Sequence, residues 1–113
     1  MATDAPLSIE RLKGKSFGSR LLRLTGPLTL KNLFEFQTEL RSGQPPLLTI
    51  LDLTAVPYMD SAGMGAVLNY YVHCEKNGIK LVCAGVSARV FELFKLTHVD
   101  SLLTVVPTAE DAE

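Results

Sequence analysis

The sequence has little that would cross-link the chain, bind a metal or anchor it in a membrane. It contains no tryptophan and only two cysteines, Cys74 and Cys83, too few for a disulfide framework. Neither cysteine has a CxxC spacing or a histidine pair at ligand spacing, so we expect two free structural thiols and no metal. The purely apolar runs are only a few residues long, whereas a membrane-spanning helix needs about 20. We therefore expect no membrane partner.

Neither positive nor negative charge predominates in the sequence. The 11 basic and 12 acidic residues give a net charge of -1, and no lysine or arginine stripe could follow a phosphate backbone, so nucleic acid is not an expected partner. Residues 1–7 lack the basic and then apolar segment of a secretion signal, which favours a cytoplasmic location. The length of 113 residues fits a single domain, 1–113, in which we expect the ends, 1–6 and 108–113, to be flexible.

Strand-like and helical patterns alternate along the chain. Strands are predicted at 7–12, 20–24, 47–53, 80–84 and 102–106, and the first two suit an antiparallel pair at a sheet edge. The nearly continuous apolar run of 47–53 is typical of a central strand. The order β-β-α-β-α-β-α-β predicts the α/β class, with a mixed sheet of four to five strands flanked by helices.

Three helices are predicted between these strands, each with an apolar face. Thr29 is the predicted cap of the first helix, which Gly43 and the two following prolines stop; Asn77-Gly78 ends the second; and Ser87 begins the third. The predicted faces consist of Leu30, Leu33, Phe34 and Leu40 in the first helix, Met64, Val67, Leu68, Tyr71 and Val72 in the second, and Val90, Phe91 and Phe94 in the third.

The segment 58–65, Tyr-Met-Asp-Ser-Ala-Gly-Met-Gly, joins the central strand to its crossover helix, at the sheet edge where α/β folds place their sites. Residues 51–68, LDLTAVPYMDSAGMGAVL, resemble the signature of the STAS family, the anti-sigma factor antagonists. That signature is an apolar residue, Asp-Ser, a small residue, glycine, an apolar residue and glycine. The resemblance extends through 80–85 and 87–97 and back to 24–26, and it implies a small mixed sheet flanked by helices.

The resemblance also implies a function. In similar antagonists the serine after the aspartate is phosphorylated by an anti-sigma factor that is a serine kinase of the histidine-kinase-like ATPase class. The unphosphorylated antagonist binds this kinase and frees the sigma factor. By resemblance, Ser61 is the phosphoacceptor, no cofactor is needed, and the expected partner-binding residues are Gly26, Pro27, Met59, Asp60, Ser61, Ala62, Gly63, Met64 and Ser87.

Local chemistry adds three expectations. Ser61 suits the N-cap of the crossover helix, with its Oγ accepting from the amide of Gly63 or Met64. The alternative to phosphorylation is that capping is the only role of Ser61. Asp60 is expected to orient Ser61 for the kinase rather than to support the fold. Gly63 and Gly65 each destabilise a helix by up to about 1 kcal/mol relative to alanine. Either a partner approaches these glycines closely or the helix packs tightly there.

Two rival functions remain. Ser61 at a strand-to-helix turn resembles the nucleophile elbow of hydrolases, but the glycine two residues before the serine is missing. His73 would lie about 18 Å along the helix from Ser61, and His98 suits a loop or helix cap, so an enzyme is not expected. The other rival is a constitutive scaffold or subunit, as in family members attached to transporters or stress-signalling assemblies.

Overall fold

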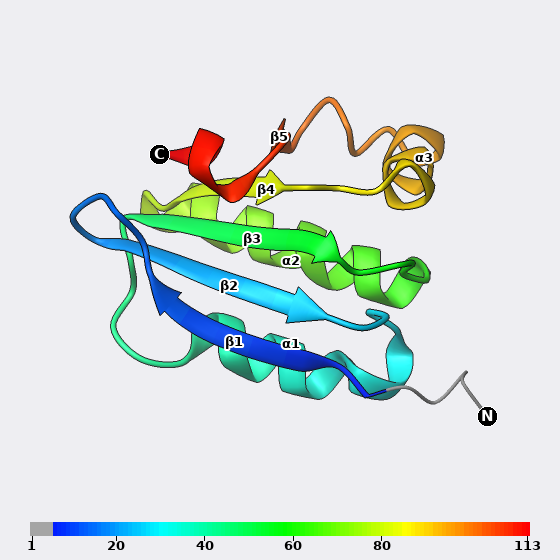
Figure 1. Cartoon of the computed structure of the whole chain (residues 1–113), viewed down its shortest axis with the longest axis horizontal. Helices are drawn as coiled ribbons and strands as arrows, with labels where there is room; N and C mark the ends of the chain where they lie inside the picture. The colour runs from blue at the N-terminus through cyan, green and yellow to red at the C-terminus, as the bar shows by residue number, and fades with distance from the viewer. Residues whose placement is uncertain (1–5) are drawn as a thin grey trace.

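The sheet begins with an antiparallel hairpin and continues with parallel strands. In the computed structural model, which describes residues 6–113, β1 (Ser8–Lys13) pairs antiparallel with β2 (Ser19–Thr25). The sheet continues with β3 (Leu48–Ala55), β4 (Lys80–Ala84) and β5 (Thr104–Val106), each parallel to the strand before it. The order of the strands across the sheet is their order in the chain (Figure 1). The edge hairpin and the central strand were therefore predicted correctly.

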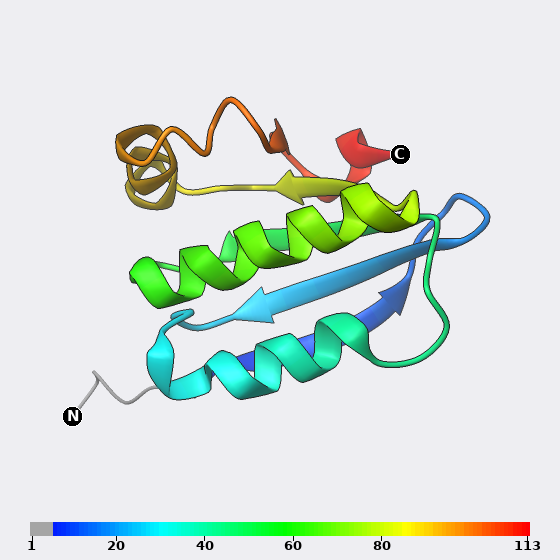
Figure 2. The ribbon, with the colours of Figure 1, turned by 180° about the vertical axis from the view of Figure 1, so that it is seen from behind.

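The helices follow the predicted order. The helix α1 (Leu33–Arg41), preceded by the 3-10 turn η2 (Leu30–Asn32), and the helix α2 (Ser61–Asn77) cover one face of the sheet (Figure 2). The helix α3 (Ala88–Leu96) lies near the carboxyl end of β4, at the same end of the molecule as the start of α2 (Figure 1). This arrangement confirms the predicted α/β class and mixed sheet.

The apolar face of α1 differs from the predicted one. Phe36 and Leu40 are buried and Leu33 packs against the core, whereas Leu30 and Phe34 are 69% and 79% exposed. Leu30 lies in η2, where each residue advances about 120° instead of 100°, so it leaves the phase of the helix that follows. Phe34 lies two residues from Phe36 and hence on nearly the opposite side of α1.

The predicted apolar face of α2 is confirmed in part. Met64 and Val67 are buried and Leu68 and Tyr71 pack against the core, whereas Val72 is exposed. The buried residues also include Ala66, Tyr70 and Cys74, which the prediction left out. The Tyr70 hydroxyl lies 2.7 Å from the Thr49 hydroxyl of β3, so burial of this ring leaves no unpaired polar atom. Burial also raises the pKa of Tyr70 to about 12. This contact joins α2 to β3, and apolar spacing alone does not indicate it.

The two cysteines have the predicted state. Cys74 and Cys83 are free and buried. Burial raises the pKa of the Cys83 thiol to about 12, which keeps it protonated and unreactive at neutral pH.

The helices α2 and α3 both end with a defined cap. Gly78, in the left-handed conformation, ends α2, and the amide of Ile79 donates to the Cys74 carbonyl at 3.0 Å. At the end of α3, His98 has a positive φ of 61° and the amide of Val99 donates to the Phe94 carbonyl at 2.8 Å. These bonds form Schellman-type ends. His98 therefore caps α3, as predicted.

The C-terminal segment differs from the expected flexible end. Residues 108–113 contain a second 3-10 turn, η3 (Ala109–Ala112), which packs on β4, and the Glu113 carboxylate accepts hydrogen bonds from the β1–β2 loop. Interactions with a loop almost a hundred residues earlier in the chain hold this segment. The other end was also expected to be flexible, over residues 1–6. Residues 1–5 lie outside the described part of the chain.

Two predicted strands, 47–53 and 102–106, begin later in the structure than predicted. Leu47 precedes β3 and is exposed, and β5 begins only at Thr104, after an exposed Leu102. Within residues 6–113, no helix combines the length and apolar character needed to cross a bilayer.

Candidate phosphorylation and docking site

Asp60, not Ser61, is the N-cap of α2. One carboxylate oxygen of Asp60 accepts from the Gly63 amide at 2.9 Å, and the other accepts from the Leu30 amide at 3.1 Å. The carboxylate thus satisfies an otherwise unpaired amide of α2 and joins α2 to η2. This finding corrects two expectations, because Ser61 does not cap the helix and Asp60 does support the fold.

Ser61 occupies the first position of α2 and is exposed. Its hydroxyl has no hydrogen-bond partner within residues 6–113, so no described side chain competes for it or covers it. The helix N-terminus has unpaired amides and roughly half a positive charge, both of which favour an anion at this position. The site can therefore accept a negatively charged group without rearranging the fold.

The loop before Ser61 is held by its neighbour between β2 and η2. Leu28 and Met59 form an isolated parallel bridge, the Leu28 amide donates to the Tyr58 carbonyl at 3.2 Å, and the Asp60 amide donates to the Leu28 carbonyl at 3.3 Å. These backbone bonds fix the height and direction of the chain where it enters α2. The backbone on which Ser61 lies is therefore held in place by these hydrogen bonds.

The two glycines of the motif have different surroundings. A Cβ added to Gly63 would lie 2.3 Å from the Leu28 carbonyl oxygen, whereas a Cβ added to Gly65 would meet no atom within 4 Å. Tight packing accounts for Gly63. Gly65 faces open space, so close approach by a partner remains a prediction for that residue alone.

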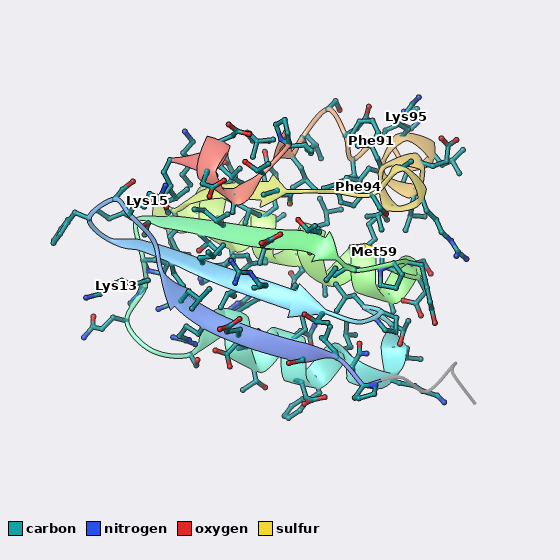
Figure 3. The ribbon with its side chains drawn as sticks, in the orientation of Figure 1. Lys13, Lys15, Met59, Phe91, Phe94 and Lys95 are labelled. Carbon is teal, nitrogen blue, oxygen red and sulfur yellow. The ribbon has the colours of Figure 1, made fainter. Side chains whose placement is uncertain are left out.

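The expected partner-binding residues gather at one end of the molecule but differ in accessibility. Met59, labelled in Figure 3, lies where the chain enters α2. Ser61 is exposed, while Gly26, Asp60, Ala62 and Ser87 are partly buried. Four others, Pro27, Met59, Gly63 and Met64, are buried. Burial leaves the side chains of Pro27, Met59 and Met64 little surface for a partner, and a partner contact at these four residues stays a prediction.

Polar contacts explain the placement of two residues of this group. The Met64 sulfur lies 3.0 Å from the Thr97 hydroxyl at the end of α3. The Ser87 hydroxyl accepts from the Val90 amide at 3.2 Å and so caps α3, as the sequence indicated. The contact between Met64 and Thr97 joins the end of α3 to the start of α2.

Two surface features near Ser61 were missed. The Arg89 guanidinium lies 5.1 Å from the centroid of the Tyr58 ring, a cation–π distance that places a positive charge over the loop preceding Ser61. Leu30, whose amide donates to Asp60, presents a 69% exposed apolar side chain. No sequence motif marks Arg89, and the helical spacing that includes Leu30 indicated burial. The described part of the chain contains no cluster of His, Cys, Asp or Glu that could hold a metal.

The capping role of Asp60 makes a testable prediction. An Asp60→Asn change keeps one carbonyl acceptor and turns an NH2 group toward the other amide, so it should lower the free energy of unfolding by about 1 kcal/mol. Urea denaturation measures this loss. Ser61→Ala is the matched control, because it removes a side chain at the same helix end that makes no cap bond. Equal midpoints for Asp60→Asn and wild type would show that the carboxylate does not support the fold.

Known proteins place this arrangement in a family. The chain is 34% identical over 55 residues to the anti-sigma-B factor antagonist of Listeria monocytogenes, an alignment covering 49% of this chain and 48% of that protein. The chain thus matches about half the length of this curated relative.

Two solved structures have the same fold over most of their length. An anti-sigma factor antagonist from Mycobacterium paratuberculosis superposes with a TM-score of 0.82 at 17% identity, covering 95% of this chain and 91% of the other. A sulfate transporter family protein from Wolinella succinogenes does so with a TM-score of 0.74 at 25% identity, covering 88% and 85%. Residues 13–112 match the family model of the STAS domain. The fold and these matches show that the chain belongs to the STAS domain family.

Proposed function

We propose that this protein is an anti-sigma factor antagonist whose binding to an anti-sigma factor is switched by phosphorylation of Ser61. The observation that carries the proposal is the exposed hydroxyl of Ser61 at the first position of α2, on a support that Asp60 and the Leu28–Met59 bridge hold in place. The similarity to the Listeria antagonist supports the same class of function.

The electrostatics of the site suit a switch of binding rather than of fold. A phosphoryl group adds about 1.5 to 2 negative charges beside the partial positive charge of the helix N-terminus, so the domain should remain folded. The same group would repel an acidic or closely packed partner surface by on the order of 1 to 4 kcal/mol per close pair. A tenfold loss of affinity needs only about 1.4 kcal/mol.

The proposed partner is an anti-sigma factor with serine kinase activity of the histidine-kinase-like ATPase class, in the cytoplasm. The contact surface would centre on Ser61 and include the exposed side chain of Leu30, the cation of Arg89 and the open backbone at Gly65. An apolar side chain and a positive charge around one hydroxyl fit a protein surface with an acidic rim.

Binding rather than catalysis is proposed because neither histidine is available to Ser61 as a base. His73 stacks on Tyr70 with ring centroids 5.8 Å apart, and His98 is the left-handed residue that ends α3. A nucleophilic serine needs a base within hydrogen-bonding reach.

A second candidate is a constitutive subunit of a transporter or stress-signalling assembly. The observation in its favour is the 25% identity to the sulfate transporter family protein from Wolinella succinogenes. The two functions differ at Ser61, because a constitutive subunit would bind its partner equally well whether or not this residue carries phosphate.

The proposal is tested by incubating the protein with ATP and a candidate kinase from a neighbouring gene. Peptide mass spectrometry then locates the phosphate. We expect one phosphoryl group per chain, on the peptide that contains Ser61, and none on Ser61→Ala. Phosphate on another residue in both proteins would contradict the assignment of Ser61. A complex with the kinase that forms equally well before and after modification would favour the constitutive subunit.

A further inference from the structure

The end of the molecule opposite Ser61 carries an exposed apolar tip. The β1–β2 loop projects beyond the strands at one end of the long axis (Figure 1), and its residue Phe17 is 94% exposed. Leu47 is 59% exposed and adjoins this loop, because its amide donates to the Gly18 carbonyl at 2.8 Å. Two large apolar side chains therefore face solvent together, far from the proposed phosphorylation site.

The loop that presents Phe17 is braced. The Glu113 carboxylate accepts from the amides of Lys15 at 2.8 Å and Ser16 at 2.5 Å, and from the hydroxyls of Ser16 at 2.7 Å and Ser19 at 3.0 Å. Four donors on one carboxylate fix the loop against η3. The loop therefore presents Phe17 in a fixed, exposed position. Docking on a surface would not have to order the loop first.

Basic residues surround this tip. Lys13 and Arg20 are directly opposed in the antiparallel pair of β1 and β2, a destabilising arrangement of like charges. Lys15 follows in the loop, and Lys80 lies beside Leu47, whose carbonyl accepts from the Lys80 amide at 2.9 Å. Figure 3 shows Lys13 and Lys15 at the hairpin end of the molecule and Met59 at the other end.

Within residues 6–113, these cations, Lys13, Lys15, Arg20 and Lys80, form no ion pair with an acidic side chain. Acidic side chains also lie near this end: Glu39 pairs with Arg11, whereas Glu113, which keeps its charge while it binds loop amides, lines with Glu110 the cavity beside Lys13 and Lys15. The Arg20 guanidinium donates to the Gln44 carbonyl, whereas no hydrogen bond is present for the side-chain amines of Lys13, Lys15 and Lys80 in the described residues. Unpaired lysines beside an exposed apolar tip indicate an external anionic surface.

From these observations we propose that the hairpin end, defined as Lys13, Lys15, Phe17, Arg20, Leu47 and Lys80, docks on the surface of a bilayer that contains anionic lipid. Phe17 enters the interfacial layer while the basic side chains face lipid phosphates. A protruding apolar tip fits a deformable interface, whereas a protein partner would need a matching pocket. Because the molecule measures 41 Å along its long axis, docking would leave Ser61 accessible to a protein partner.

The proposal goes beyond the proposed function and does not depend on it. It also limits the expectation of no membrane partner, which rested on the lack of a spanning segment and does not bear on contact with a surface.

Vesicle co-sedimentation of the full chain tests the proposal. We expect binding to vesicles of phosphatidylglycerol and phosphatidylcholine, none to phosphatidylcholine alone, and weakening as salt rises. Lys15→Glu should lower binding roughly 25-fold, since one Lys or Arg near such a surface is worth about a factor of five and charge reversal doubles the free-energy change. Phe17→Ser removes the apolar side chain that enters the interface and should lower binding at least about tenfold. Both residues are exposed, so the variants should fold.

Phe34→Ser is the matched control, because Phe34 is a 79% exposed phenylalanine on α1, outside the hairpin end. It should bind vesicles as well as wild type does. Failure of wild type to bind anionic vesicles at low salt would overturn the proposal, even if the hairpin end then proved to bind an acidic protein. Equal losses in Phe17→Ser and Phe34→Ser would overturn it as well, because the contact would not be specific to this end.

Discussion

Replacement of Ser61 by aspartate is expected to weaken binding to the cognate anti-sigma factor at least tenfold. The change puts a fixed negative charge at the first position of α2, beside the carboxylate of Asp60. The new exposed charge would face any acidic or closely packed partner, and one unfavourable contact of about 1.4 kcal/mol is enough for the expected loss. Isothermal titration calorimetry with the purified partner measures the two dissociation constants.

The same substitution should leave stability unchanged or slightly raised. Aspartate in the first turn interacts favourably with the helix dipole, by about 0.3 to 1 kcal/mol. Ser61→Ala is the binding control, because it shortens the side chain without adding charge and should retain most of the affinity. Wild-type affinity in Ser61→Asp, or an equal loss in Ser61→Ala and Ser61→Asp, would show that charge at this position does not control docking.

Opposite effects on stability are expected from alanine at the two glycines of α2. In Gly63→Ala the new Cβ would lie 2.3 Å from the Leu28 carbonyl oxygen, which is backbone and cannot rotate away. Overpacking of this kind destabilises by about 1 to 3 kcal/mol. In Gly65→Ala the Cβ meets open space, and the higher helix propensity of alanine should stabilise the fold by up to about 1 kcal/mol.

Chemical denaturation of the two variants therefore separates packing from partner contact. We expect about 3 kcal/mol between them, with wild type in between. Gly65→Ala also tests partner approach, because a partner that comes close to the open backbone at Gly65 would bind this more stable variant less tightly. Similar stabilities for Gly63→Ala and Gly65→Ala would mean that the contact with Leu28 is not a constraint on Gly63.

The order of the elements and the position of the site could be predicted from the sequence. The apolar run that became β3 has the length and continuity of a strand covered on both faces, and in an α/β sheet the loop after such a strand is a usual place for a site. The exposure of Ser61 also follows from its position where that loop enters α2. These features depend on short-range patterns and on general rules of sheet topology.

The details that were missed depend on contacts between distant segments. Asp60 joins α2 to η2 because the Leu30 amide reaches its second carboxylate oxygen, and Tyr70 of α2 pairs its buried hydroxyl with that of Thr49 in β3. In the same way, Glu113 is held by the hairpin loop near the start of the chain. Periodicity within one helix or strand contains no information about such partners.

The most direct test of the central claim compares the phosphorylated and unphosphorylated wild-type protein in a titration against the same anti-sigma factor. The exposed hydroxyl of Ser61 on its braced helix end predicts that the unphosphorylated protein binds at least tenfold more tightly, while both forms give the same circular dichroism spectrum. Equal affinity of the two forms, with phosphate confirmed on Ser61, would contradict the account.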